Sequence, residues 1–165
     1  MWDFRRKGWT FRSGGDGPNA FSGSGLFKST DGGASWTELT SPNAVGLPPK
    51  PWGRSAVAIA PSKASTVYIT IEAEIPRDGL YRSDDSGKTW KQLDRSQNMI
   101  WRPFYFANLI IDPKDPNKVC KPDGPLIASN DGGQSFSNIS GGAHGDFHDV
   151  WINPNNTDHV KLYHE

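Results

Sequence analysis

The sequence is poor in cysteine, in net charge and in long apolar runs. Cys120 is the single cysteine among 165 residues, so it has no second thiol in the chain with which to form a disulfide. Lys and Arg together number 18, as do Asp and Glu, and the formal net charge is +0. Because duplex binding rests on clustered basic residues, we expect no nucleic-acid partner. No apolar run approaches the roughly 18 residues of a membrane span, and no secretory signal pattern follows Met1.

Glycine and proline are abundant instead. The chain contains 18 Gly and 13 Pro, and 12% of its residues are aromatic. This composition favours short strands and frequent turns over long helices. The length suits one ordinary domain, so we interpret residues 1–165 as a single unit.

Three octets repeat the pattern Ser-x-Asp-x-Gly-x-Ser/Thr-Trp/Phe. They cover residues 29–36, 83–90 and 129–136, and their aspartates lie 54 and then 46 residues apart. The main constrained positions are Ser29, Asp31, Gly33, Trp36, Ser83, Asp85, Gly87, Trp90, Ser129, Asp131, Gly133 and Phe136. A period of this length is typical of repeat architectures such as propellers and solenoids.

A second repeat interleaves with the octets. An Ile-x-Pro tripeptide ends at Pro61, Pro113 and Pro154, and a valine follows each proline after six residues. Each unit therefore reads as four short strands, which in the best preserved unit are expected at 56–60, 67–72, 79–82 and 89–93. Four short antiparallel strands per repeat make the blade of a β-propeller. We predict an all-β propeller fragment with about two complete blades and two partial ones.

The octet aspartates are expected to be structural. A carboxylate just ahead of a tight turn can accept backbone N–H bonds from its own loop, and the octet glycine supplies conformational freedom there. The aromatic residue that ends each octet is expected to fill the space between neighbouring sheets. The pattern therefore indicates a locked hairpin and not a catalytic group.

These octets resemble the bacterial neuraminidase (BNR) repeat, or Asp-box, of sialidases, xyloglucanase-like glycoside hydrolases and the sortilin (Vps10) propeller. The stretches 142–154 and 2–6 are similar to large bacterial proteins described as BNR-repeat glycosyl hydrolases or as sortilin-like. The resemblance implies a propeller in a secreted or periplasmic parent protein, with either carbohydrate or a protein or peptide as ligand. It does not decide activity, because this repeat occurs in enzymes and in receptors alike.

The repeat boundaries predict blades or blade remnants at about 1–40, 54–94, 104–140 and 146–165. Counting from the anchors, the octet that should follow Pro154 would fall beyond Glu165, and the proline expected before Asp31 is absent. The two terminal units are therefore expected to be partial, with the remaining blades of a longer parent as their partners. An isolated run of blades is expected to expose apolar faces.

Strand order predicts which end of the blades carries function. The octet turn joins strands three and four, so it shares an end with the turn between strands one and two. The opposite end is built from the loops between blades, 40–54, 94–106 and 140–147, and from the loops 3–24, 72–78 and 121–124 between strands two and three. Long loops on a rigid scaffold are where binding residues concentrate, so we expect the site at this end.

Two sets of polar residues there are candidates for chemistry. His144, Asp146 and His148 alternate at period two, and in an extended chain they would share one side as a partial metal site. The same spacing suits residues that hydrogen-bond a turn, and we expect no metal or other cofactor. Glu72 and Glu74, with Asp146, are the candidate catalytic carboxylates, since glycoside hydrolysis uses a pair. A solvated loop rim or pairing with Arg77 is the alternative reading.

Aromatic and arginine side chains form the candidate ligand-binding set. Its members are Trp52, Arg54, Trp101 and Arg102, together with His144 and His148. Flat apolar rings beside fixed donors suit a sugar or a protein loop, and packing between blades is the alternative use for the rings. Because the Phe-Arg-Ile-Pro motif of sialidases is absent, we do not expect true sialidase activity.

Two functional hypotheses follow. In the first, the chain is a propeller segment of a glycosyl-hydrolase-like protein that binds, and in some cases hydrolyses, carbohydrate opposite the octet turns. In the second, it is a sortilin-like propeller that binds protein or peptide and catalyses nothing. A pair of carboxyl groups converging in one pocket on that face would favour the enzyme.

Overall fold

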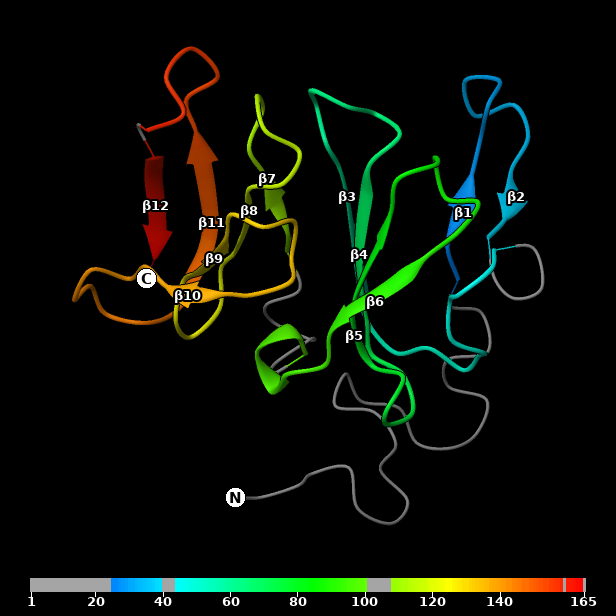
Figure 1. Ribbon diagram of the computed structural model, residues 1–165, viewed down its shortest axis with the longest axis horizontal. Helices are drawn as coiled ribbons and strands as arrows, with labels where there is room; N and C mark the ends of the chain where they lie inside the picture. Colours follow the sequence, from blue (N-terminus) through cyan, green and yellow to red (C-terminus); the bar gives the residue numbers. More distant parts are fainter. Residues whose placement is uncertain (1–24, 40–43, 101–107, 159, 165) are drawn as a thin grey trace.

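A computed structural model describes residues 25–39, 44–100, 108–158 and 160–164 (Figure 1). Apart from one short 3-10 turn, η1 (Gln97–Met99), its regular elements are strands. They are β1 (Phe27–Lys28), β2 (Thr37–Glu38), β3 (Ser55–Ile59), β4 (Val67–Ile71), β5 (Gly79–Ser83), β6 (Lys91–Asp94), β7 (Ile110–Ile111), β8 (Val119–Lys121), β9 (Ile127–Ser129), β10 (Ser137–Asn138), β11 (Phe147–Ile152) and β12 (Val160–His164). The described ranges hold no helix with the length and hydropathy needed to cross a bilayer.

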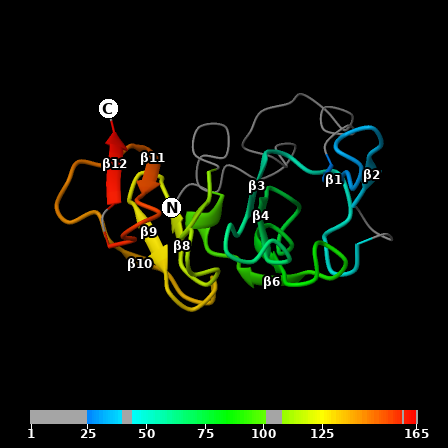
Figure 2. The ribbon, with the colours of Figure 1, turned by 90° about the horizontal axis from the view of Figure 1, so that it is seen from above.

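The strands form four antiparallel sheets that follow the chain in order. Two are four-stranded, β3-β4-β5-β6 and β7-β8-β9-β10, and two are two-stranded, β1-β2 and β11-β12. Figures 1 and 2 show the sheets side by side, with β1-β2 at one end of the row and β11-β12 at the other. This arrangement confirms the all-β organisation that the repeats predict, including two complete units and two partial ones.

Strand positions in the sheet β3-β4-β5-β6 agree with the sequence pattern. The first three strands lie within one residue of the expected ranges at each end, but β6 begins at Lys91 and not at residue 89. The physical reason is that Thr89 still belongs to the octet turn, where its backbone N–H donates to the Asp85 carboxylate at 2.9 Å. Its N–H is therefore not available for pairing with β5.

The octet turns have one hydrogen-bond network in all three copies. In the second copy, Ser83 Oγ donates to Asp85 Oδ1 at 2.8 Å and accepts the Gly87 N–H at 2.8 Å. The hydroxyl of Thr89 donates to Asp85 Oδ2 at 2.6 Å. Equivalent bonds surround Asp31 and Asp131. We call these hairpins the aspartate turns. Their carboxylate oxygens accept hydrogen bonds from residues of the same turn, as the structural interpretation predicts.

Hydrogen bonds hold the pKa values of the aspartate-turn carboxyl groups well below their usual range. For Asp31 and Asp131 the largest contribution comes from the hydroxyl of the serine four residues later, and for Asp85 from the hydroxyl of Thr89. Backbone N–H donors from the same residues add to the effect. A carboxylate that accepts several such bonds is stabilised in its charged form.

The aromatic residues of the octets differ in burial. Trp90 is 7% exposed, packs with Leu26 and Leu39 of the neighbouring sheet, and donates from Nε1 to the Gly87 carbonyl at 3.0 Å. Trp36 makes the same bond to Gly33, yet it is 63% exposed. The expectation that each octet aromatic fills an intersheet space is therefore wrong for Trp36. Among the described residues, its sheet β1-β2 lies at one end of the row and packs only against the sheet β3-β4-β5-β6 (Figure 1).

Three apolar clusters lie between adjacent sheets. One joins β1-β2 to β3-β4-β5-β6, and the next joins the two four-stranded sheets around Tyr68, Leu80 and Val119. The third packs Phe147, Val150 and Ile152 of β11 against the sheet β7-β8-β9-β10. The core is thus divided among the intersheet spaces, so each sheet is stabilised chiefly by its neighbours.

Candidate ligand-binding face

Hydrogen bonds place the aspartate turns at one end of the sheets. The Ser86 N–H donates to the Ser65 carbonyl at 2.9 Å, and the Gly132 N–H donates to the Asn117 carbonyl at 2.9 Å. Ser65 and Asn117 lie in the turns between the first and second strands of their sheets. As strand order predicts, the loops 72–78 and 122–126 are then left at the opposite end, together with the segments that lead into β3 and β11.

Glu72 is the central polar residue of this end in the sheet β3-β4-β5-β6. It is buried, and its Oε2 accepts the backbone N–H of Arg54 at 3.2 Å. Its carbonyl accepts the Gly53 N–H at 2.7 Å, which ties the loop after β4 to the segment before β3. The bond to Oε2 offsets part of the cost of burying the carboxylate. Arg54 itself is exposed beside this junction.

Trp52 precedes this junction but does not face solvent. Its side chain is fully buried in the cluster with Ile69, Ile71 and Trp90, and Nε1 donates to the Pro48 carbonyl at 3.1 Å. The ring therefore packs between sheets, which is the alternative use noted for the aromatic residues. In this structure no face of the ring is open to a ligand.

Glu72 and Glu74 do not form a matched carboxylate pair. The strand β4 ends at Ile71, so both residues follow it, and Glu74 is exposed in the turn where its carbonyl accepts the Arg77 N–H at 2.8 Å. One carboxylate is thus buried and the other solvated. The two residues therefore do not share a strand face, because β4 ends before Glu72.

Side chains of β5 and β6 support the loop 72–78 through hydrogen bonds to its backbone carbonyls. Gln92 Nε2 donates to the carbonyls of Asp78 and Pro76 at 2.9 and 3.1 Å, and the Tyr81 hydroxyl donates to the Arg77 carbonyl. Burial, with the nearby Asp78 carboxylate as the next contribution, raises the pKa of Tyr81 to about 12. Tyr81 therefore stays a neutral donor throughout the physiological range, and the loop is held on a fixed support.

A buried ion pair occupies the same end of the next sheet. Lys121 Nζ donates to Asp123 Oδ2 at 2.6 Å, and the two side chains are 0% and 3% exposed. Burial lowers the pKa of Lys121, and the attraction of Asp123 opposes that effect. These two residues are not among the candidate site residues predicted from the sequence. Their signal was a lysine in the strand that begins at Val119, followed two residues later by an aspartate.

Asp123 also fixes the segment that leads into β11. Its Oδ1 accepts the Gly124 N–H at 2.7 Å, and its carbonyl accepts the Phe147 N–H at 3.0 Å. The Gly124 carbonyl accepts the Asp146 N–H at 3.2 Å. A Cβ on Gly145 would lie 2.5 Å from the Gly124 carbonyl oxygen, so this close approach requires glycine.

His144, Asp146 and His148 are not arranged as the sequence spacing predicts. The strand β11 begins only at Phe147, and Asp146 has a φ of 74°, in the left-handed region. His144 lies in the exposed loop with Nδ1 2.9 Å from the Gly145 carbonyl, whereas His148 is half-buried within the strand. The period-two alignment is therefore wrong, because the chain turns at Asp146. Within the described ranges, no three His, Cys, Asp or Glu side chains are grouped to hold a metal ion.

Trp101 and Arg102 lie outside the described residues, as do the neighbouring Phe104 and Tyr105 and the loop 3–24. The described part of this face therefore contains two buried carboxylates, Glu72 and Asp123, which we call the frame of the face. Arg54 and His144 are exposed beside them. Glu72 and Asp123 each accept backbone N–H bonds that lock a loop between strands two and three.

Comparison with solved structures identifies the fold. A GH74 enzyme from Niastella koreensis aligns with a TM-score of 0.58 and 16% identity over 79% of this chain and 21% of its own. An ancestral GH74 enzyme aligns with a TM-score of 0.52 and 18% identity over 84% of this chain and 18% of its own. Both are β-propeller enzymes. The described sheets are blades of a β-propeller.

This propeller segment spans about a fifth of the length of each of those two enzymes. A GH74 xyloglucanase from Xanthomonas campestris aligns over 67% of this chain with 28% identity and a TM-score of 0.48. No protein-family model and no curated protein matches the chain. The comparisons establish the architecture, and activity has to be argued from the site.

Proposed function

We propose that this chain is a propeller segment of a glycosyl-hydrolase-like protein and that it binds carbohydrate at the end opposite the aspartate turns. The observation that carries the proposal is the frame around Glu72 and Asp123. The Glu72 carboxylate ties the loop 72–78 to the segment before β3. The backbone carbonyls of Asp123 and Gly124 tie the loop 122–126 to the segment before β11, while the buried Asp123 carboxylate holds its own loop. Rigid loops of this kind present polar groups at fixed positions, which is what recognition of sugar hydroxyls requires.

Arg54 and His144 are the residues that we assign to ligand contact. Both side chains are exposed. The backbone of Arg54 is hydrogen-bonded to Glu72, and His144 lies two residues before Asp146, whose N–H is bonded to the Gly124 carbonyl. A guanidinium offers five N–H donors in a fixed plane, and an imidazole offers a donor and an acceptor. These groups match the paired hydroxyls of a sugar ring.

The proposal is for binding and not for hydrolysis. Glycoside hydrolysis uses two carboxyl groups about 5 to 9.5 Å apart across the sugar bond. Glu72 and Asp123 already accept internal hydrogen bonds, Asp123 is paired with Lys121, and Glu74 is solvated. None of these three carboxylates is placed as one half of such a pair, so the described residues supply a binding surface.

We further assign the aspartate turns to the Asp-box class, and we infer that the parent protein is exported. The first assignment is supported by the identical network of Ser, Asp and Gly in three copies. Export follows from the resemblance of these repeats to those of secreted and periplasmic proteins.

Binding of soluble polysaccharides tests the proposal. Affinity gel electrophoresis or calorimetry would use xyloglucan, other β-glucans and an α-glucan as the comparison. We expect Arg54→Ala and His144→Ala each to weaken the binding of a recognised glycan about 5- to 10-fold, the usual effect of losing one good hydrogen-bonding side chain.

Lys63→Ala is the matched control, because Lys63 is an exposed cation at the aspartate-turn end. It should leave the affinity unchanged. Failure of every polysaccharide to bind, or an equal loss in Lys63→Ala, would reject the assignment of this face.

A further inference from the structure

The buried ion pair of Lys121 and Asp123 occupies positions that are apolar in the other complete sheet. In both four-stranded sheets the octet serine lies opposite a valine of the second strand, which aligns β8 with β4 residue by residue. Lys121 then corresponds to Ile69 and Asp123 to Ile71, and these isoleucines are 2% and 0% exposed. A blade of this protein can therefore be built with two apolar side chains at these positions.

The stability of the blade does not account for this difference. Replacing a buried ion pair by well-packed apolar residues is often neutral or stabilising, because taking two charges out of water costs as much as their attraction returns. The pair in the sheet β7-β8-β9-β10 has to be explained by what its polar atoms hold in place.

The Asp123 carboxylate orients the peptide group that follows it. Its Oδ2 accepts from Lys121 Nζ at 2.6 Å, and its Oδ1 accepts the Gly124 N–H at 2.7 Å. That N–H belongs to the peptide group between Asp123 and Gly124, whose carbonyl points the opposite way because the group is planar and trans. This carbonyl accepts the Phe147 N–H at 3.0 Å. The carboxylate thus fixes the carbonyl that receives the first residue of β11.

A second peptide group continues the connection to His144. The Gly124 carbonyl accepts the Asp146 N–H at 3.2 Å, and the carbonyl of that same peptide group, which belongs to Gly145, lies 2.9 Å from His144 Nδ1. Because a carbonyl only accepts, Nδ1 is the donor and carries the proton of the neutral ring. The exposed imidazole is therefore left with Nε2 as its acceptor.

The preceding sheet holds this segment at a second point. Asn108, just ahead of β7, donates from Nδ2 to the His148 carbonyl at 3.3 Å. Between the two points of attachment, Asp146 has a φ of 74°. A residue other than glycine keeps a left-handed conformation only where the surrounding structure fixes it. The segment that carries His144 is therefore set by contacts with the sheet β7-β8-β9-β10.

We propose that Asp123 is a positioning residue of the ligand-binding face. Through the two peptide groups it holds His144 with Nδ1 protonated and with Nε2 presented as a hydrogen-bond acceptor. The ligand group that fits this nitrogen is a sugar hydroxyl that donates to it. The identity of the ligand rests on the proposed function, whereas the positioning of the ring does not. This role explains why a carboxylate stands where the other complete sheet has Ile71.

Two double variants of the full chain separate positioning from stability. Lys121→Met with Asp123→Asn, the Asn variant, removes both charges and retains an oxygen for the Gly124 N–H. Lys121→Met with Asp123→Leu, the Leu variant, has the same side-chain shape at position 123 and no oxygen. Neither leaves a buried charge without its partner, and Ile71 shows that the fold accepts an apolar side chain at this position. Far-ultraviolet circular dichroism and urea unfolding verify that both variants are folded.

Nuclear magnetic resonance measures the positioning without any ligand. The nitrogen chemical shifts of the neutral His144 ring report which nitrogen carries the proton, and their loss in His144→Ala assigns them. We expect the Nδ1–H form in the unsubstituted chain and in the Asn variant, and a shift toward the Nε2–H form in the Leu variant. Amide exchange at Asp146 and Phe147 should be about 10-fold faster in the Leu variant, the effect of losing one hydrogen bond of typical strength.

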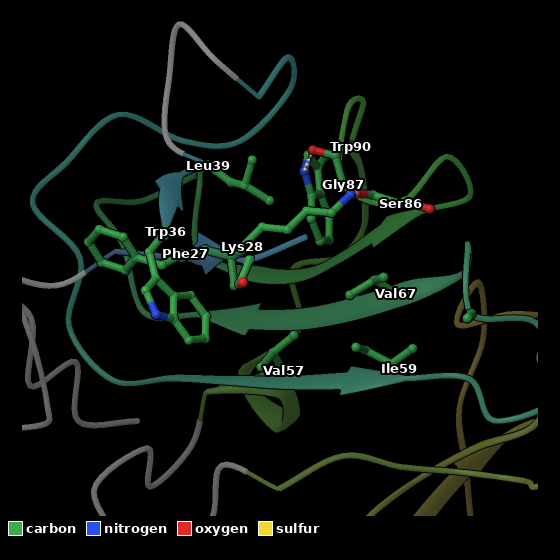
Figure 3. Close-up of a pocket in the computed structure, with 13 residues that line it drawn as sticks. Phe27, Lys28, Trp36, Leu39, Val57, Ile59, Val67, Ser86, Gly87 and Trp90 are labelled. Carbon is green, nitrogen blue, oxygen red and sulfur yellow. Dashed lines mark hydrogen bonds between the residues drawn. The ribbon is translucent and has the colours of Figure 1, made fainter. Parts of the chain in front are cut away.

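Affinity for a polysaccharide that the unsubstituted chain binds is the second measurement. The Leu variant should bind about 5- to 10-fold more weakly, as His144→Ala does, and the Asn variant should bind like the unsubstituted chain. Val57→Thr is the control, because Val57 is exposed on β3, where it lines an apolar groove of about 360 Å³ between β1 and β3 (Figure 3). It should change neither the His144 signals, nor the amide exchange, nor the affinity.

The outcomes separate the two parts of the inference. The same His144 tautomer and the same amide exchange in both double variants would overturn the positioning role. If these signals differ as expected but no polysaccharide binds, the positioning role is supported and the proposed carbohydrate function fails. Equal affinities of the two variants for a bound polysaccharide, despite different tautomers, would overturn the assignment of Nε2 to a sugar hydroxyl.

Discussion

Replacing Asp123 by Asn isolates the energetic role of the buried ion pair. The Asp123 carboxylate receives Lys121 Nζ on Oδ2 and the Gly124 N–H on Oδ1. An asparagine keeps an oxygen for Gly124 and the shape of the side chain, but it removes the charge beside Lys121. The substitution leaves an ammonium group buried without its counter-charge.

The magnitude follows from the geometry of the pair. At 2.6 Å, two unit charges attract by about 6 kcal/mol when the effective dielectric constant is about 20. Removing the carboxylate also removes its own desolvation cost, which returns part of that energy. Buried pairs that lose one partner are destabilised by about 3–5 kcal/mol. We expect Asp123→Asn to lower the free energy of unfolding by about 3 kcal/mol.

Urea unfolding at several pH values is the assay. Burial already lowers the pKa of Lys121, so the unfolded state binds the proton more tightly, and stability rises with pH between the folded and unfolded pKa values. Without Asp123 the folded pKa falls further, and this rise begins at a lower pH. The deficit of the variant should therefore be largest near neutral pH and should shrink as the pH approaches that of an unfolded lysine, about 10.4.

Two further variants make the result decisive. Glu74→Gln changes an exposed carboxylate of the same end and should shift stability by no more than about 0.5 kcal/mol. Combining Lys121→Met with Asp123→Asn should recover most of the lost stability, because no charge then remains buried. A deficit below about 1 kcal/mol, or one that does not change with pH, would show that water screens the pair and would refute the reasoning.

Other parts of the fold provide three more predictions. Gly46→Ala should cost more than about 2 kcal/mol in thermal unfolding, because its Cβ would lie 2.0 Å from the Trp90 carbonyl oxygen at a φ of 97°; Gly32→Ala, at a φ of 71° with open space around it, should cost only about 1 kcal/mol. The pKa of the Asp85 carboxyl group is lower in the folded than in the unfolded protein, so the stability that it contributes is lost as the pH falls below the unfolded pKa, near 3.8. The melting temperature of the unsubstituted protein should therefore drop more steeply below pH 4 than that of Asp85→Asn. Burial raises the pKa of Cys120 to about 11, so its alkylation at pH 8 should be slow in the folded protein and fast in urea; equal rates would contradict this burial.

The aspartate turns show why much of the fold was readable from the sequence. Their hydrogen bonds join residues no more than four positions apart, such as Ser83 with Gly87 and Asp85 with Thr89. A local network of this kind has to be written in consecutive residues, so three copies reveal three hairpins. The Ile-x-Pro repeat then locates the strands between them, and β4 was predicted to within one residue.

The candidate face was less predictable because its geometry depends on residues distant in sequence. The alternation of His144, Asp146 and His148 suggested an extended chain, but backbone pairing of Asp146 with Gly124 turns the segment there. The sequence predicts Trp52 as a ligand contact, yet its side chain is buried in the apolar cluster that contains Ile69 of β4. The local sequence pattern does not indicate either contact, because Gly124 and Ile69 are distant in sequence from Asp146 and Trp52.

Trp36 and Trp90 show the same division between local and tertiary information. Both indoles donate to the carbonyl of their octet glycine at 3.0–3.1 Å, so the octet sequence fixes their position relative to their own hairpin. Their exposure differs, 63% against 7%, because burial is decided by what surrounds each hairpin. In a repeat protein the exposure of a residue can be compared with that of its equivalents in the other repeats, a comparison that a fold without repeats does not offer. An apolar residue exposed in one repeat and buried in its equivalents points to the missing neighbour, and the equivalents show what that neighbour must look like.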